Sequence, residues 1–264
     1  MLNVLKHIPH LYTYSCTELS NRRILVTGDM FIKIFSLDTY EELKDIRSED
    51  NNWDSLVTPD EKYLFTATDR GLKQYSLPDF TLVRVHEPSS DGYCLAYLKS
   101  KNKVLFRDHS KLLSLDVNTS TVTVLRDKHE SYIKSIVSTS NEEYVFSTGN
   151  DNKLKQWSTD SGSVLKSVEI DSDGRSLLVK EDTNSILVGM YNGSLAEYSL
   201  NDLSLIRIVK VHKDWIRKII RLSTGEVITC SSDGNVCFPF KDKFTLKVSD
   251  KGLFSITKLS DKKI

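Results

Sequence analysis

Three residues in the middle of the chain have side chains that could together perform hydrolysis: His129, Ser147 and Asp151. When serine, histidine and aspartate meet in space, they can act as nucleophile, general base and orienting acid of a hydrolase triad. The same residue types also hold tight turns together through side-chain hydrogen bonds. The elements that position the three residues decide between catalysis and structure.

The composition is that of an ordinary globular protein. The 264 residues include 36 Lys and Arg and 36 Asp and Glu, so no net field draws the chain to nucleic acid or an anionic membrane. The first residues, MLNVLKHIPHLYTYSC, do not resemble a secretory signal. No apolar run approaches the roughly 18–20 residues that span a bilayer. We expect an intracellular protein, cytoplasmic or nuclear.

The four cysteines do not indicate a metal site. Cys16, Cys94, Cys230 and Cys237 contain no CxxC pair, so zinc ligation is not expected and reduced, buried thiols are the better interpretation. Cys230 and Cys237 flank a turn, which leaves a cross-strand disulfide open as an alternative. The sequence indicates neither a metal nor a cofactor.

A repeat of about forty residues is the strongest pattern in the chain. Six segments share a polar turn followed by a short strand-like run with an aromatic or apolar end. The end positions are separated by 40, 40, 42, 41 and 41 residues. They are Phe35, Tyr75, Leu115, Trp157, Tyr198 and, less clearly, Pro239. Units of this length indicate an architecture in which each repeat covers the face of the next.

Each repeat contains four runs with the alternation typical of strands, and no long window has helical spacing. The turns NDN, YNG and SDG supply residues that adopt positive φ in tight hairpins. The sequence therefore predicts a single all-β domain, a propeller of four-stranded antiparallel blades with six complete repeats and a partial seventh. The repeats are 11–48, 49–88, 89–127, 128–170, 171–210 and 211–249, and terminal strands are expected within 1–8 and 250–264.

Two stretches resemble WD40 blades: FSTGNDNKLKQWS in the fourth repeat and VHKDWIRKIIRLSTGEVITCSSDGNV, residues 211–236, in the sixth. The resemblance covers nearly the whole chain and is weakest in the third repeat. It implies that a histidine, a hydroxyl residue, a turn aspartate and a tryptophan form a structural hydrogen-bond chain within a blade. The matching residues are His129, Ser147, Asp151 and Trp157 in the fourth repeat and His212, Thr229 and Asp233 in the sixth.

The second copy of this set favours structure over catalysis, because a catalytic triad would occur once. Buried polar groups need partners, and these residues can satisfy one another in a fixed network. The other repeats depart from the pattern, and softer blades are expected there. In the second repeat, Thr66 and Asp69 lack a histidine in register, although His86 ends a strand nearby. In the third repeat, His109 lies within the turn itself, and in the fifth, Asn192 takes the place of the aspartate.

The chain ends leave the number of blades open. Residues 253–259 resemble the innermost strand of a seventh blade, and residues 2–8 resemble an outer strand. One interpretation is a six-bladed ring with extra terminal strands. The other is an incomplete seventh blade, whose open wedge would accept strands from a partner or from a second copy of the chain.

The resemblance implies a rigid scaffold that binds a protein or peptide on its rim. Tyr132 and Trp215 stand at equivalent positions before two innermost strands, and Trp53 lies near its own equivalent with the register shifted. Large aromatic residues are good anchors, although they could instead pack against a neighbouring loop. Charged residues around them would make a mixed rim suited to a peptide: Glu130, Lys213 and Asp214.

A propeller enzyme or lectin, acting on a small or glycan ligand at the central channel, is the competing class. STDSGSVL, residues 158–165, superficially resembles the Ser-x-Asp-x-Gly box of sialidase-like propellers, but its closing aromatic is missing and it occurs once. The sequence shows no arginine cluster that would invite an acidic sugar. Zero net charge disfavours nucleic acid. We therefore expect a non-catalytic interaction scaffold, a subunit of a larger complex.

Overall fold

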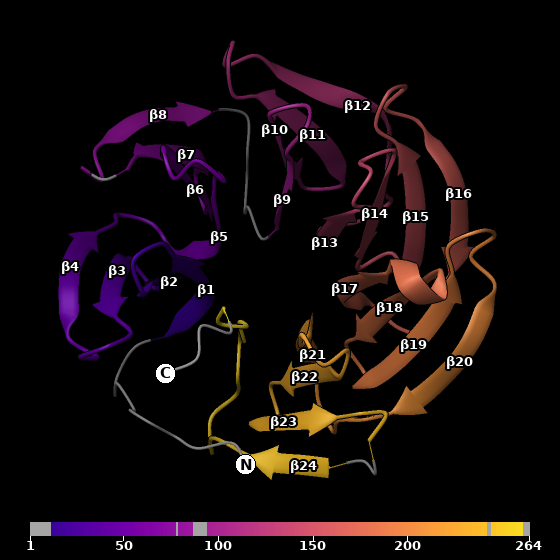
Figure 1. Cartoon of the computed structure of the whole chain (residues 1–264). Coiled ribbons are helices and arrows are strands. Elements are labelled where there is room, and N and C mark those ends of the chain that lie inside the picture. The colour runs from indigo at the N-terminus through magenta and orange to yellow at the C-terminus, as the bar shows by residue number, and fades with distance from the viewer. Residues whose placement is uncertain (1–11, 78, 87–93, 242–243, 261–264) are drawn as a thin grey trace.

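The computed structural model describes residues 12–77, 79–86, 94–241 and 244–260. Within these ranges the strands form six four-stranded antiparallel sheets, which stand around a common axis like the blades of a propeller (Figure 1). The one helical element of the described ranges is the 3₁₀ turn η1, Glu181–Thr183. The predicted all-β propeller with six four-stranded blades is confirmed.

In each blade the four strands pair in chain order, from the innermost to the outermost. Blade one contains β1 (Thr13–Leu19), β2 (Arg23–Gly28), β3 (Phe31–Ser36) and β4 (Glu42–Arg47). Blade two contains β5 (Asn52–Val57), β6 (Tyr63–Thr68), β7 (Gly71–Ser76) and β8 (Leu82–His86). Blade three contains β9 (Leu95–Leu98), β10 (Lys103–Asp108), β11 (Lys111–Asp116) and β12 (Val122–Lys128).

The second half of the ring continues in the same way. Blade four contains β13 (Ile133–Ser138), β14 (Tyr144–Gly149), β15 (Lys153–Ser158) and β16 (Val164–Glu169). Blade five contains β17 (Gly174–Lys180), β18 (Ser185–Met190), β19 (Ser194–Ser199) and β20 (Leu205–Lys210). Blade six contains β21 (Ile216–Arg221), β22 (Val227–Ser231), β23 (Asn235–Phe238) and β24 (Phe244–Lys247).

The hydrophobic core lies between blades, because the middle strands are covered on both faces. Every residue of β18 is buried, whereas the outermost strand β20 of the same blade is mostly exposed. Between blades three and four, Trp157 and Val145 pack against Leu105. Trp157 is fully buried, and burial of a side chain of this size contributes roughly 3 kcal/mol. Each blade therefore depends on its neighbours for its own core.

The hairpin turns have the predicted backbone. Asn152, Gly193 and Gly234 have φ of 54°, 81° and 80°, in the left-handed region that tight turns require. At Gly234 a Cβ atom would lie 2.0 Å from the carbonyl oxygen of Ser249. That close approach, as well as the positive φ, requires glycine at this turn.

A serine–glutamate clasp joins neighbouring blades and recurs around the ring. In each clasp, one carboxylate accepts hydrogen bonds from the backbone N–H and the hydroxyl of a serine, which in three of the four pairs follows an innermost strand. For Ser140 and Glu181 both distances are 2.5 Å. The pairs are Ser20–Glu61, Ser100–Glu142, Ser140–Glu181 and Ser260–Glu18.

The last of these clasps attaches the C-terminal segment to the first blade. On the other side, the N–H of Leu253 donates to the carbonyl of Ser231 in blade six at 2.9 Å. The segment between them lies between blades six and one (Figure 1), although no strand is assigned to residues 249–260. A partial seventh blade is therefore not confirmed. Residues 2–8 lie outside the described ranges, and strand addition by a partner stays a prediction.

Candidate functional site: blade latches and the channel mouth

His129, Ser147, Asp151 and Trp157 form one hydrogen-bond chain inside blade four, here called the fourth-blade latch. The indole N–H of Trp157 donates to Ser147 Oγ at 2.7 Å, and that hydroxyl lies 2.6 Å from His129 Nε2. His129 Nδ1 lies 2.9 and 2.8 Å from the two carboxylate oxygens of Asp151. Since the carboxylate can only accept, Nδ1 carries the proton and Nε2 accepts from the serine hydroxyl.

This connectivity is that of a hydrolase triad, but its location prevents catalysis at Ser147. His129 and Ser147 have no exposed surface, and Asp151 retains only 2 % of its side-chain surface. A substrate carbonyl could not reach the hydroxyl without opening the core between two blades. Burial alone would raise the pKa of Asp151, but hydrogen bonds from His129 and from the Glu130 N–H lower it below its ordinary value. The carboxylate therefore stays ionised.

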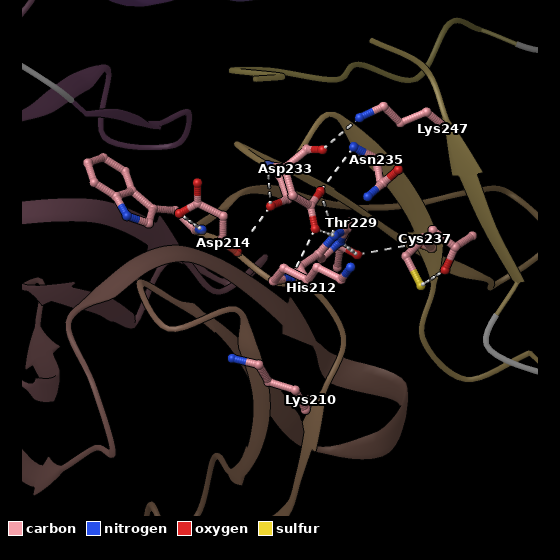
Figure 2. A network of polar contacts seen from close by, with 12 residues as sticks. Lys210, His212, Asp214, Thr229, Asp233, Asn235, Cys237 and Lys247 are labelled. Atoms are coloured by element: carbon pink, nitrogen blue, oxygen red, sulfur yellow. Dashed lines mark hydrogen bonds and ion pairs between the residues drawn. The ribbon is translucent and has the colours of Figure 1, made fainter. Parts of the chain in front are cut away.

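Blade six holds a second latch with the same connectivity (Figure 2). His212 Nδ1 lies 3.2 and 3.1 Å from the carboxylate oxygens of Asp233, and Nε2 lies 2.8 Å from Thr229 Oγ1. Burial lowers the pKa of His212, although Asp233 opposes the shift. No indole completes this latch, because the position that corresponds to Trp157 is Pro239, just after β23 ends at Phe238.

Four of the polar residues that depart from the pattern have other partners. Asp69 accepts a hydrogen bond from the indole N–H of Trp53. Asn192 donates to Asp171 at 2.9 Å, and His86 Nε2 lies 2.9 Å from Gln74 Oε1. The ring of His109 lies 5.1 Å from that of Tyr132. These residues hold loops and strands, but none of them reproduces the three-residue latch.

The cavity at which the innermost strands meet is the central channel. It has a volume of about 670 Å³ and is lined by residues of all six innermost strands and of the C-terminal segment. In five of these strands the pairing register shifts once near the beginning, which leaves one residue outside the ladder. Such a β-bulge turns a side chain away from the regular alternation. The residues at these positions are Tyr14, Trp53, Lys134, Arg175 and Arg217.

All five bulge residues line the channel, as does Phe254 of the C-terminal segment. We call these six residues, together with Trp215 and Lys218, which also line the cavity, the channel mouth. Tyr14 stacks on Trp53 at 4.5 Å between ring centroids and meets Phe254 edge-on at 5.3 Å. The Arg217 guanidinium lies 4.1 Å from the Trp215 ring and 4.7 Å from Phe254. Aromatic rings and cations therefore alternate in contact around part of the channel.

Of the aromatic residues proposed as partner anchors, Trp53 and Trp215 line the channel. Both also pack within the protein, since the Trp215 ring lies 4.5 Å from that of Tyr191 in the preceding blade. Tyr132 lies outside the cavity and packs against His109. Trp53 is a bulge residue, two positions beyond the equivalents of Tyr132 and Trp215, which accounts for its shifted register.

The three charged rim candidates do not line the channel. Glu130 pairs with Lys153 on the surface. The backbone N–H of Lys213 donates to Asp233 at 3.0 Å. The carboxylate of Asp214 accepts from the Trp215 N–H at 2.8 Å, so it fixes the backbone beside the anchor.

Sequence reasoning missed the cationic part of the mouth and found no arginine cluster. The fold corrects this, because the guanidinium groups of Arg175 and Arg217 lie 4.7 and 4.1 Å from the same Trp215 ring. The two arginines are 42 residues apart in sequence and come together only through the radial packing of blades five and six. One signal was available: both residues occupy the same position in their repeats, next to the start of the innermost strand.

The structure gives the cysteines no reactive role. All four are free thiols, so the alternative of a Cys230–Cys237 disulfide is wrong for this structure. Burial raises the pKa of Cys94 and of Cys230 to about 12, which keeps both protonated. Among the described residues, no three His, Cys, Asp or Glu side chains are grouped to hold a metal ion. No helix in that part of the chain is long and apolar enough to cross a bilayer.

Comparison with known families gives one match. The family model described as WD domain, G-beta repeat, matches residues 119–158. The matched segment runs from the outer strand of blade three through β15 and includes the whole fourth-blade latch. None of the curated proteins compared with the chain matched it.

Proposed function

We propose that this β-propeller, which matches the WD40 repeat over residues 119–158, is a non-catalytic scaffold that binds a protein or peptide at its channel mouth. Such a protein would act as a subunit of a larger complex. Propellers of this family commonly serve as interaction scaffolds, but a fold does not by itself identify a ligand. The proposal therefore depends on the residues at the mouth.

The proposal depends mainly on one observation: the side chains of the bulge residues converge on the channel. The innermost strands each contribute to one cavity, and the side chains at its mouth include Tyr14, Trp53 and Trp215. These rings are partly exposed and lie on, or directly before, innermost strands that are fixed by the core. Rigid aromatic anchors give much contact area for little loss of side-chain entropy.

The buried latches support a scaffold rather than an enzyme. The His–hydroxyl–Asp arrangement occurs in both blade four and blade six, and its histidine and hydroxyl are buried in each, which favours a recurring part of blade construction over a catalytic site. The STDSGSVL segment forms the end of β15, the following turn and the start of β16, away from the central channel (Figure 1). We also propose an intracellular location, which the four free thiols support.

The proposal is tested by affinity purification with three versions of the protein from the same cells: wild type, Trp215→Ala and Phe244→Ala. Both variants remove one aromatic ring, but Phe244 lies on the outermost strand of blade six and is 54 % exposed. We expect a discrete set of proteins with wild type and Phe244→Ala that is lost with Trp215→Ala. Recovery of the same set with all three versions would exclude the channel mouth as the partner site.

A separate assay addresses catalysis. Purified protein is incubated with generic ester and glycoside substrates, with His129→Ala in parallel, at a temperature where both are folded. We expect no turnover above the buffer rate. Activity that survives purification and disappears in His129→Ala would contradict the scaffold proposal.

A further inference from the structure

The charge of the channel mouth is divided unevenly around the axis. The bulge residues of blades one and two are aromatic, Tyr14 and Trp53, and those of blades four, five and six are cationic. Figure 1 shows β1 and β5 on one side of the axis and β13 and β17 on the other. The mouth therefore has an aromatic arc and a cationic arc. The cationic arc contains Lys134, Arg175, Arg217 and the exposed Lys218.

Among the described residues that line the channel, Asp54 is the one carboxylate. Its oxygens accept hydrogen bonds from the N–H groups of Leu95 and Ser55, both at 2.9 Å, and from the Ser15 hydroxyl at 3.1 Å. Asp54 thus ties blade two to blades one and three. Arg175 also pairs with Asp173, at 3.4 Å between its guanidinium and the carboxylate. Four cations against two engaged carboxylates still leave a local positive field, although the net charge of the chain is zero.

The two guanidinium groups are held in place by aromatic contacts. Arg175 lies 4.7 Å from the Trp215 ring and 5.1 Å from Tyr191, and Arg217 lies against Trp215 and Phe254. The Nε of Arg217 also donates to Ser232 Oγ at 2.6 Å. A stacked guanidinium keeps its N–H donors in its own plane, where carboxylate or phosphate oxygens can meet them in bidentate geometry.

We propose that the channel mouth binds an acidic peptide segment, whose carboxylate or phosphate groups pair with Arg175, Arg217 and the neighbouring lysines. An apolar side chain next to the acidic group would pack on the aromatic arc formed by Tyr14, Trp53 and Phe254. The inference rests on the proposed function and names the chemistry of its partner. A cavity of about 670 Å³ holds a few side chains of an extended peptide.

A peptide fits these observations better than a nucleic acid. Binding of a nucleic-acid backbone needs a basic surface that follows a row of phosphates. Here the cations form a single arc within one channel, and the chain carries equal numbers of acidic and basic residues. A single anionic group or a short cluster of them matches this arrangement.

The experiment measures fluorescence anisotropy with three labelled pools of nine-residue peptides that have random flanks. The central position is fixed as glutamate in the first pool, phosphoserine in the second and glutamine in the third. A single-stranded oligonucleotide is the fourth probe. We expect at least one acidic pool to bind tenfold or more tightly than the glutamine pool, since hydrogen bonds to charged groups exceed neutral ones by about this factor. The acidic pool that binds more tightly shows whether the channel mouth recognises a carboxylate or a phosphate group.

The matched variants are R175Q/R217Q and R84Q/R126Q, which remove the same charge. Arg84 and Arg126 are exposed on the outer strands β8 and β12. We expect R175Q/R217Q to lose the preference for acidic peptides and R84Q/R126Q to retain it. Because the first variant also alters packing around Trp215, Lys218→Glu provides a second test: its side chain is exposed, and we expect at least a threefold loss.

The inference is overturned if the glutamine pool binds as tightly as the acidic pools, if both mouth variants bind like wild type, or if the oligonucleotide binds more tightly than either acidic pool. Its failure can be told apart from failure of the scaffold proposal. If Trp215→Ala still loses a captured protein, the mouth binds partners of another chemistry. If Trp215→Ala changes nothing, both proposals fail.

Discussion

The fourth and sixth blades contain the same latch, with its tryptophan in blade four and without one in blade six. In blade four, Asp151, His129, Ser147 and Trp157 form a chain of four residues in which the serine hydroxyl meets both the imidazole and the indole. In blade six the hydroxyl of Thr229 contacts the backbone carbonyl of Cys237 at 3.4 Å instead of an indole, and Pro239 stands at the tryptophan position. The aspartate is also less buried there, with 10 % of its side-chain surface exposed against 2 % in blade four.

The comparison shows which parts of the latch a blade requires. The histidine, the hydroxyl and the aspartate keep the same order of contacts in both blades, although the hydroxyl residue changes from serine to threonine. The tryptophan can be absent without changing that order. The latch is therefore a three-residue unit that connects the loop before the innermost strand, the second strand and the turn that follows it. The indole adds packing and one further hydrogen bond.

The largest effect is expected from His129→Ala. The change removes the partner of a buried carboxylate and of a buried hydroxyl, so we expect the free energy of unfolding to fall by about 3 kcal/mol. Urea unfolding followed by tryptophan fluorescence measures it. His109→Ala is the control, because that side chain is 52 % exposed and should lose no more than about 0.5 kcal/mol. Equal losses for the two variants would contradict the structural role of the latch.

His212→Ala should have a smaller effect, a loss of about 2 kcal/mol. Water can approach Asp233 more readily than Asp151, and no indole depends on the hydroxyl of Thr229. The measurement is the same urea titration under the same conditions. A loss larger than that of His129→Ala would break the comparison between the two blades.

Trp157→Phe isolates the contribution of the indole N–H, because most of the ring volume is kept. We expect a loss of about 1 kcal/mol, the usual net value of a hydrogen bond. The double variant Trp157→Phe/His129→Ala should lose less than the sum of the single changes, since both act on Ser147. Strict additivity would show that the two bonds are independent and that blade four has no cooperative chain.

The smallest effect is the pH dependence of blade six. Burial places the pKa of His212 below its unfolded value of about 6.5, so the unfolded chain takes up a proton before the folded chain does. The stability that the folded state gains from neutral His212 is complete above pH 6.5. It is lost as the pH falls below that value towards the pKa of His212 in the folded state. His86, whose pKa burial also lowers, acts in the same direction.

The check is the urea midpoint between pH 7.5 and pH 5, for the wild type and for His212→Gln. The wild type should lose stability on acidification, and the variant should show a shallower slope. A wild type that gains stability below pH 6.5 would mean that His212 is protonated in an ion pair with Asp233 in the folded state.

Much of the fold and of the latches was predictable, because both depend on short-range patterns. The spacing of Phe35, Tyr75 and Trp157 gives the length of a blade, and residues such as Gly234 mark hairpins through their positive φ. A latch involves residues about twenty positions apart within a single repeat, His129 and Asp151 for example. The sequence of one repeat therefore contains nearly all of its geometry.

The channel mouth was not predictable in the same way. Arg175, Arg217 and Phe254 come from three different units and converge only when the blades pack around the axis. The β-bulges that direct the two arginine side chains interrupt the two-residue alternation, so a regular strand pattern assigns them to the wrong face. The partial seventh blade is not confirmed, for a related reason. Residues 253–259 have strand-like alternation, but their described contacts do not form a ladder of backbone hydrogen bonds.

The central claim is that the latches stabilise the individual blades and that the channel mouth binds the partner. One paired measurement tests it: the free energy of unfolding and the affinity for the acidic peptide pool, determined for wild type, His129→Ala and Lys218→Glu. The account predicts that His129→Ala loses stability but binds like wild type at a temperature where it is folded, and that Lys218→Glu does the reverse. Loss of binding in folded His129→Ala, with unchanged binding in Lys218→Glu, would contradict it.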